Sequence, residues 1–205
     1  MAFLLLEHCG NTEEARFHSR QLEVTFKRLE QGTEAQMGLE ELRNKWLLRL
    51  AMLNQMSGDH EKAVQQTTEH LSTVSQAKLY DYETFSSLWI QMKSLLSLQR
   101  WEEVLVVGDK ALSSWPEQGH KGWASLTLIL QAEALNALAN VQESQAKALL
   151  ALEWIGDWNA PPEHWSRLSG LLPAEKQQVA RERGQLSLQQ YSSSLAQYPE
   201  LQASY

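Results

Sequence analysis

The sequence predicts an all-α protein, and three observations lead to that prediction. Apolar side chains recur at helical spacing along most of the 205 residues, as at Trp46, Leu50 and Leu53. There are only 10 Gly and 5 Pro, and they fall between the periodic segments, which favours long helices over many short strands. A pattern of helix, short polar corner and second helix then returns several times along the chain.

The clearest hairpin runs from Trp46 to Leu71 around the corner Ser57-Gly58-Asp59. Gly58 suits the left-handed backbone that ends many helices, and Asp59 suits the N-cap of the next one. Along the whole chain we expect helices over 2–8, 11–29, 34–56, 59–75, 79–98, 101–116, 123–139, 143–154 and 163–169, and a last long helix from 173.

Several of these boundaries have local reasons. Residues 104–107, VLVV, would suit a strand alone, but Trp101, Val104 and Ala111 keep the helical period, so we expect a helix that stops at Pro116. Pro173 suits the first turn of the last helix. We expect one helical-repeat domain over 1–205, with a partial hairpin at 1–30, helical hairpins at 34–160 and a C-terminal capping region at 161–205.

The corners align with one another as an internal repeat. Ser57–Ala63, Leu98–Val104 and Asn140–Ala146 recur at 41 and 42 residues, and Cys9–Ala15 is a looser copy. Each has a polar corner, an acidic or polar stretch and then a small or branched apolar residue. Fixed spacing of this size is typical of a helical solenoid.

These corners resemble those of tetratricopeptide repeats. In that family a small residue early in the second helix lets the two helices pack closely, and Ala63, Val104 and Ala146 match that position. The resemblance covers about residues 44–160 and implies a right-handed α-α superhelix with a C-terminal capping helix. Further matching positions are Leu50 and Ala51 in a first helix, and Ala111, Leu112 and Pro116 in a second.

The chain departs from the family pattern in spacing and at two positions. Its spacing exceeds the usual 34 residues of the family, and His70 and Glu153 stand where a small residue is usual. Repeats of this longer spacing are similar to those in sensor regions of large bacterial transcription activators. That similarity leaves open a sensor or regulatory region that binds a small effector or a peptide.

Composition and charge exclude several classes of protein. A net charge of −7 without a Lys/Arg cluster argues against direct nucleic-acid binding. No apolar run reaches the ~18 residues that a membrane span needs, and Phe3–Leu6 is too short for a signal peptide. Cys9 is the only cysteine, so no intrachain disulfide can form. We therefore expect a cytoplasmic protein.

No residue pattern indicates a reaction, a cofactor or a metal. His60 and His70 are ten residues apart and so do not share a helical face, and the zinc motif HExxH does not occur. Phosphate-binding and nucleophile-elbow motifs are missing as well. Cys9 could serve as a nucleophile, but beside an apolar run it is more often a packing residue. We expect a protein that is not an enzyme.

In a solenoid of such hairpins the first helices line the concave side. The expected partner-binding residues there are Lys45, Leu48, Met52, Gln55, Ser86, Trp89, Lys93 and Leu96. Leu128, Gln131, Leu135 and Leu138 would continue this surface in the next repeat, unless the C-terminal helices cover them. Such a mixture suits a peptide or helix with apolar anchors, although most of the eight tryptophans are expected to be packing residues.

The function predicted from these features is a protein–protein interaction module, namely an adaptor, scaffold or chaperone. At the N-terminus, Phe3–Leu6 would cover most of the circumference of a short helix, which one neighbouring helix cannot bury. We expect this end to be covered by a preceding segment or by self-association, the alternative being that it folds back onto its own hairpin.

Overall fold

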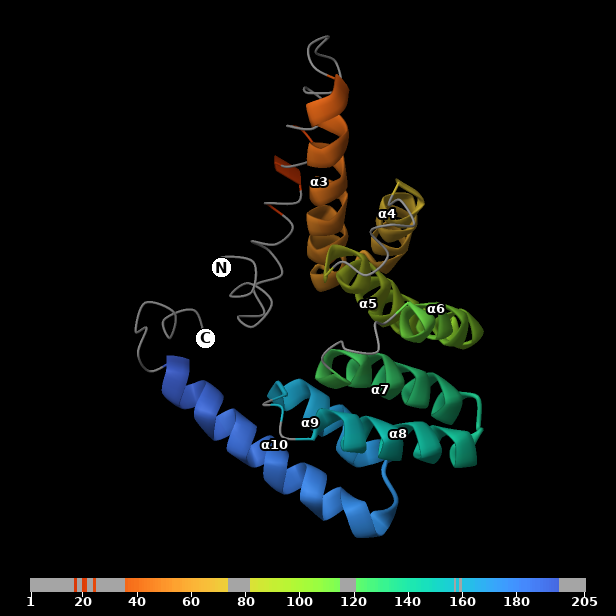
Figure 1. Cartoon of the computed structure of the whole chain (residues 1–205), viewed down its shortest axis with the longest axis vertical. Coiled ribbons are helices and arrows are strands. Elements are labelled where there is room, and N and C mark those ends of the chain that lie inside the picture. Colours follow the sequence, from red (N-terminus) through yellow and green to blue (C-terminus); the bar gives the residue numbers. More distant parts are fainter. Residues whose placement is uncertain are drawn as a thin grey trace. The chain divides into compact units, whose positions relative to one another are not determined.

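A computed structural model describes residues 17, 20, 21, 24, 36–73, 82–114, 121–156, 158 and 160–195. Within these, the side chains of 36–42, 45, 82, 123, 194 and 195 are not described. Throughout this part of the chain the regular structure is α-helix and no strand occurs (Figure 1). The all-α prediction is confirmed, and residues 104–107 belong to a helix.

The helices agree closely with the expected ranges between 34 and 173. They are α3 (Gln36–Met56), α4 (His60–Thr73), α5 (Tyr82–Ser97), α6 (Trp101–Ser113), α7 (Lys121–Ala137), α8 (Val141–Ile155), α9 (Pro162–Leu171) and α10 (Ala174–Leu195). The chain divides into two compact units, one up to Leu98 and the other from Gln99, and each is described separately below.

In the first unit, α3 packs against both α4 and α5, and α4 also packs against α5. Its core contains fully buried side chains from α3 and α5, including Leu50, Leu53, Leu88 and Met92. His70 of α4 is also buried, and its Nδ1 atom forms a hydrogen bond with Oγ of Ser87 in α5, at 2.8 Å. This bond gives the buried polar ring a partner inside the unit.

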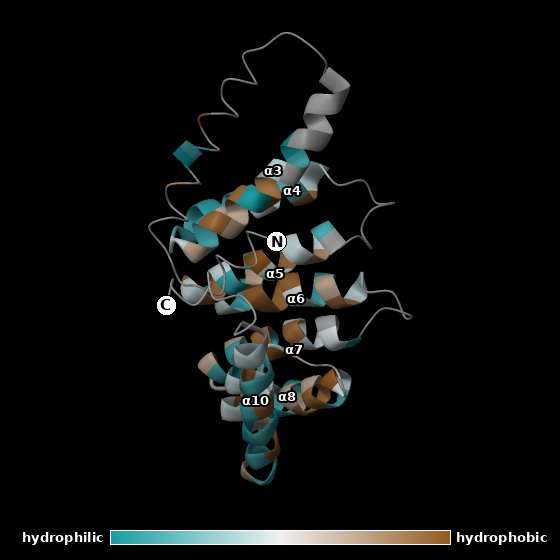
Figure 2. Cartoon of the chain, turned by 90° about the vertical axis from the view of Figure 1, so that its left-hand side faces the viewer, coloured by the Kyte–Doolittle hydropathy of each residue, from teal (hydrophilic) through white to brown (hydrophobic). Residues whose placement is uncertain are grey.

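In the second unit, α7 is the central helix. It packs against α6, α8 and α9, while α9 also packs against α8 and α10. Every described side chain of α7 from Ala124 to Ala132 is buried, which explains why this helix lacks a polar face. Figure 2 shows the same contrast, with brown, apolar residues on α7 and mostly teal residues along α10.

The last helix is held against α9 by a close crossing. A Cβ atom on Gly184 would lie 3.0 Å from the Cβ of Trp165, so the absence of a side chain lets the two helices approach. The hydroxyl of Ser187 donates to the carbonyl oxygen of Ala160 at 2.7 Å, and the guanidinium of Arg183 lies over the Trp165 ring. The long C-terminal helix predicted after Pro173 is present as α10.

Three corners share the same local backbone geometry. Gly58, Gln99 and Ala139 all have positive φ, at 83°, 58° and 60°. The residue after Gly58 and the residue after Ala139 each donate a backbone N–H to the carbonyl five residues earlier, at 2.8 and 2.9 Å. This arrangement is the Schellman motif at a helix C-terminus. In it, one left-handed residue allows backbone carbonyls of the last helical turn to accept hydrogen bonds from N–H groups that follow the helix.

The side chains at these corners repeat as well. The residue that follows the left-handed position contacts the residue three further on in each case. Asp59 pairs with Lys62 at 2.7 Å, Arg100 with Glu103 at 2.5 Å, and the amide of Asn140 donates to Glu143 at 2.7 Å. We call this contact, between the residue after the left-handed position and the residue three further on, the closing contact. The three corners make it with three different pairs of side chains.

The geometry corrects the repeat spacing predicted from the sequence. The left-handed residues are 41 and 40 residues apart, not 41 and 42. In the third corner Ser144, which is 1% exposed, takes the buried position of Ala63 and Val104, whereas Ala146 is exposed. Likewise Ala151 is buried where Glu153 had been aligned, and Glu153 faces solvent. The sequence alignment is therefore two residues out at the third corner.

Most of the N-terminal expectations lie outside the described residues. Phe17, Arg20, Gln21 and Val24 are helical, in agreement with the helix expected over 11–29, and their side chains are exposed. The expectations for Phe3–Leu6, Cys9 and self-association through this end concern residues that the structure does not describe, and they stay predictions.

Candidate partner-binding face

Three large apolar side chains meet where α3 and α5 pack together. Leu48 and Met52 from α3 and Trp89 from α5 are partly buried and contact one cluster of buried residues. That cluster consists of Ala51, Ala63 and Ile90, exposed by 0%, 0% and 3%. We call the surface formed by Leu48, Met52, Trp89 and Lys93 the α3–α5 face.

Lys93 joins this face through the aromatic ring of Trp89. Its Nζ atom lies 4.7 Å from the ring centroid, within the range of a cation–π interaction. The two residues are four apart on α5, so one face of the helix presents both. A ligand that reaches the Trp89 ring therefore also comes close to a positive charge.

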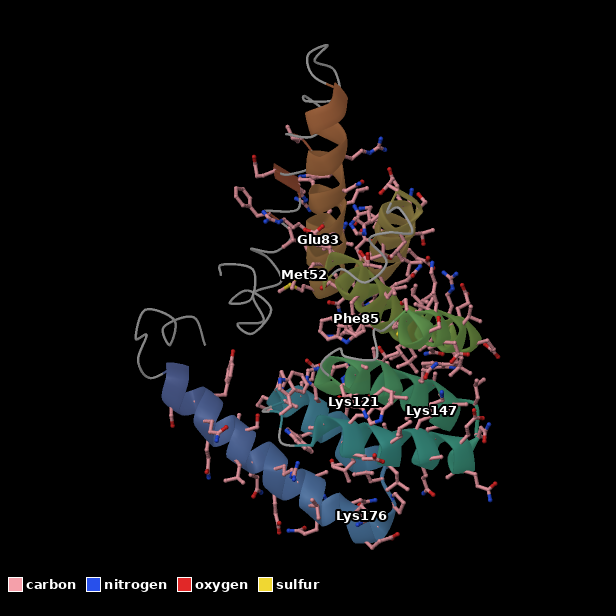
Figure 3. All side chains as sticks on the ribbon, viewed as in Figure 1. Met52, Glu83, Phe85, Lys121, Lys147 and Lys176 are labelled. Atoms are coloured by element: carbon pink, nitrogen blue, oxygen red, sulfur yellow. The ribbon has the colours of Figure 1, made fainter. Side chains whose placement is uncertain are left out.

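The other predicted site residues extend this face by helical spacing alone. Gln55, Ser86 and Leu96 are partly buried and lie three residues from Met52, Trp89 and Lys93 respectively. The side chain of Lys45 lies outside what the structure describes. Figure 3 shows the labelled Met52 near the end of α3 beside α5, with Glu83 and Phe85 at the beginning of α5.

One basic residue near the face was not among those predicted. Arg49 is exposed and lies three residues before Met52, on the flank of the same side of α3. The sequence itself indicates a locally basic segment around Arg49, because no Asp or Glu occurs between Leu42 and Gly58. The chain as a whole is acidic. The sequence prediction did not include Arg49 because the basic residues of this helix follow Glu40 and Glu41, a mixture of charges that is typical of a solvated helix face.

The expected continuation of the face onto α7 is wrong. Leu128 and Leu135 are buried, at 2% and 4% exposure, and only Leu138 reaches the surface. Gln131 is fully buried and points toward α6 and α8 instead of a partner-binding surface. Its amide nitrogen donates to Asp109 at 2.8 Å, and its oxygen accepts a hydrogen bond from Lys147 at 2.8 Å.

This row is buried because other helices of its unit cover α7. The short helix α9 packs against both α7 and α8, and Arg167 of α9 forms an ion pair with Glu133 of α7 at 2.8 Å. The alternative expected from the sequence was coverage by the C-terminal helices, and the packing of α9 against α7 agrees with it in part. Lys147, labelled in Figure 3, reaches from α8 to the amide of Gln131.

No group of three or more His, Cys, Asp or Glu that could hold a metal ion occurs among the described residues. His70 is used in its bond to Ser87. Nor does any helix in the described ranges combine the length and apolar character needed to cross a membrane. The α3–α5 face offers apolar contact and positive charge, which are suited to noncovalent binding.

Comparison of the chain with protein-family models, with curated proteins and with solved structures finds no match. The function proposed below therefore depends on the sequence and on the geometry of the α3–α5 face.

Proposed function

We propose that this protein is a noncatalytic protein–protein interaction module that binds a peptide or helix on the α3–α5 face. The module would act as an adaptor, scaffold or chaperone. The observation that carries the proposal is the arrangement of Leu48, Met52 and Trp89, three large apolar side chains that stay partly exposed above a tightly buried platform.

Such an arrangement suits the known features of binding surfaces. Anchors at protein interfaces are enriched in aromatic residues, and Trp contributes more than most because its large ring is rigid. Because Ala51, Ala63 and Ile90 hold these side chains from below, they would lose little conformational freedom on binding. The α3–α5 face would therefore be preorganised to bind an apolar side chain of the partner.

The proposal includes an architecture and a compartment. We infer a right-handed α-α superhelix of the tetratricopeptide-like kind, and the recurring corners at Gly58, Gln99 and Ala139 support it. The α3–α5 face would belong to its concave side, since both are first helices of their hairpins. A cytoplasmic location is supported by the single cysteine, because disulfide frameworks are a mark of oxidising compartments.

The test is a selection from a display library of random peptides of about 16 residues, long enough for four helical turns. The whole chain is the target, and each recovered peptide is measured against wild type and Trp89→Ala. Loss of an interface anchor should weaken binding by ~2 kcal/mol or more. Truncation of a core residue would instead lower stability by ~3–5 kcal/mol, so affinity and thermal melting are measured on the same protein.

Trp46→Ala is the matched control. Trp46 is a partly buried tryptophan on α3, but it lies two residues before Leu48 and so points about 200° away around the helix. It should lower stability without changing peptide affinity. Failure to recover any peptide whose affinity depends on Trp89 would show that the α3–α5 face is not a binding site.

A further inference from the structure

We propose that the outward side of α8 is a self-association surface, on which two copies of this chain pair their α8 helices in an antiparallel dimer. This surface, which we call the outer α8 face, consists of five exposed residues, namely Gln142, Ala146, Leu149, Leu150 and Glu153. They recur at intervals of three and four residues, so one side of the helix presents all of them. The outer α8 face is separate from the α3–α5 face and does not depend on the proposed function.

The corners place the same side of the other second helices in register with this face. Counted from the left-handed residues Gly58, Gln99 and Ala139, the five positions lie 3, 7, 10, 11 and 14 residues further along. The matching residues are Glu61, Gln65, Thr68, Glu69 and Ser72 in α4, and Glu102, Val106, Asp109, Lys110 and Ser113 in α6. All of these side chains are exposed except Glu69, which is partly buried. This side therefore faces outward in each of the three helices.

The outer α8 face differs from its counterparts in composition. Positions 10 and 11 after the corner are polar or charged in α4 and α6, as with Asp109 and Lys110, but they are Leu149 and Leu150 in α8. These leucines are 39% and 37% exposed, although α7 and α9 pack against α8. Ala146 lies one turn before them on the same side. Single exposed apolar residues are ordinary, but an apolar group where the equivalent helices are polar indicates a surface that a partner covers.

The apolar residues of this face fit a second copy that runs in the opposite direction. In an antiparallel pair with a two-fold axis near the middle of α8, Ala146 of each copy lies opposite Leu149 and Leu150 of the other. The small alanine leaves room for the large leucines, so the two helices can approach closely without a gap. In a parallel pair the leucines would meet one another, and the two alanines would face each other across an empty space.

The polar ends of the face favour the same direction. In the antiparallel pair Gln142 of each copy lies opposite Glu153 of the other, so that an amide N–H can donate to a carboxylate at both ends. A parallel pair would instead bring the two Glu153 carboxylates together, and like charges in an interface are repulsive. The dipoles of the two helices also attract each other only in the antiparallel arrangement. The face is thus complementary to itself in one direction.

The dimer should be weak because the contact is small. It involves one helix of 15 residues from each copy, and this falls short of the roughly 1,200 Å² that stable complexes bury. We expect a dissociation constant of about 0.1 mM. At the micromolar concentrations used for thermal melting the chain would then be a monomer.

The test is sedimentation equilibrium of the whole chain at concentrations from about 10 μM to about 1 mM, which span the expected dissociation constant. Wild type should change from monomer to dimer over this range. The double variant Leu149→Gln/Leu150→Gln should associate at least about tenfold more weakly, because both apolar contacts are lost at each half of the dimer. Leu186→Gln/Leu188→Gln is the matched control, since these leucines of α10 are 59% and 54% exposed and should not matter.

A second pair of variants tests the direction of the helices. Gln142→Glu places a carboxylate opposite Glu153 of the other copy at both ends, and it should weaken the dimer about fivefold at low ionic strength. Adding Glu153→Lys to the same chain turns each repulsive pair into an ion pair and should restore the dimer. In a parallel dimer the new charges would meet their own copies, so the second substitution would restore nothing.

Each result decides for or against the α8 dimer. A chain that is monomeric at about 1 mM would overturn it. So would a dimer that survives Leu149→Gln/Leu150→Gln, because the association would then use another surface, and so would equal weakening by Leu186→Gln/Leu188→Gln. Failure of Glu153→Lys to restore the Gln142→Glu variant would overturn the antiparallel pairing. The variants change exposed residues only, and thermal melting confirms that each one is folded.

Discussion

Gln131 of α7 lies directly against Gly108 of α6. A Cβ atom on Gly108 would come within 2.6 Å of the Cγ and Nε2 atoms of Gln131, closer than real contacts allow. The Gln131 side chain cannot easily move away, since it is fully buried and hydrogen bonds to Asp109, Lys147 and the carbonyl of Leu105. The missing side chain at residue 108 and the buried amide at residue 131 depend on each other.

Gly108→Ala should therefore destabilise the protein, although alanine is the better helix former by about 1 kcal/mol. Displacing Gln131 would break buried hydrogen bonds and overpack the contact, with a cost of ~1–3 kcal/mol each. We expect a net loss of about 1–3 kcal/mol in the free energy of unfolding, measured by urea denaturation.

Two further variants test the cause of that loss. In Gln131→Ala the clash disappears, so adding Gly108→Ala to it should cost nothing or stabilise, which a double-mutant cycle would reveal. Gly170→Ala is the control at a helical glycine with nothing within 4 Å of the added Cβ, and it should stabilise slightly. Equal effects of alanine at 108 and 170 would contradict the contact.

Substitutions at the left-handed residues of the three corners should change the stability of the protein in opposite directions. Gln99 and Ala139 hold a conformation in which a Cβ atom clashes with the backbone, at a cost of roughly 1–2 kcal/mol. Gly58 holds the same conformation without this cost, because glycine has no Cβ atom. Allowing for the greater flexibility of glycine in the unfolded chain, Ala139→Gly and Gln99→Gly should stabilise by ~0.5–1 kcal/mol, and Gly58→Ala should destabilise by about 1 kcal/mol. Chemical denaturation of the three variants measures all of these effects.

A control variant makes the same alanine-to-glycine substitution at a residue whose backbone is helical and not left-handed. Ala137→Gly, in the last turn of α7, removes the same methyl group from an exposed residue in helical conformation. It should lower stability by roughly 0.5–1 kcal/mol, as glycine does within helices. If Ala139→Gly were destabilising by the same amount, residue 139 would not be left-handed in solution.

The helices were predictable because their signals are local. Period, breakers and caps lie within a few residues of one another, and Gly58 and Pro173 marked an end and a beginning correctly. The corner at Ala139 was displaced by two residues, although the corner at Gln99, which also has no glycine, was placed correctly. The burial of Ser144, which shows the correct register, depends on the neighbouring helix and is not visible in the local sequence.

The candidate site was predictable where it depends on one helix at a time. Trp89 and Lys93 share a face by spacing, and the structure brings them together with Leu48 and Met52. Gln131 shows where this reasoning fails. A polar residue at the expected position looked like a surface residue, but its partners Asp109 and Lys147 lie on two other helices. Only the tertiary structure shows that this amide is buried and satisfied.

The corrected repeat gives a test with one substitution at two positions. Ala63 is fully buried where α4 approaches α3, so Ala63→Glu would bury an unpaired charge and should cost several kcal/mol, about 3 or more. Ala146 was aligned with Ala63 by sequence but is exposed on α8. Ala146→Glu should therefore change stability by no more than ~0.5 kcal/mol.

Thermal melting of these variants measures both effects. Glu61→Ala, on the exposed side of α4, should be nearly silent and controls for changes of charge at this corner. Ser144→Glu should behave like Ala63→Glu, because Ser144 is the buried residue of the third corner. Severe destabilisation by Ala146→Glu together with tolerance of Ser144→Glu would restore the original alignment.

The last prediction concerns the carboxylate at the second corner. The hydrogen bonds that Glu103 accepts from Arg100 lower the pKa of this carboxyl below its ordinary value. Burial opposes this shift, and the positive charge of Arg100 lowers the pKa further. Because the folded-state pKa is depressed, the contact stabilises the protein above the ordinary carboxyl pKa and is lost as the pH falls through the folded value.

Titration of the Glu103 side-chain carbon by NMR should therefore show a lowered midpoint that rises in Arg100→Ala. Arg100→Asn copies the third corner, where Asn140 donates to Glu143, and should give an intermediate midpoint because it keeps a donor without the charge. Lys110→Gln removes an exposed charge elsewhere on α6 and should leave the midpoint unchanged. An unaltered midpoint in Arg100→Ala would mean that the closing contact of this corner does not persist in solution.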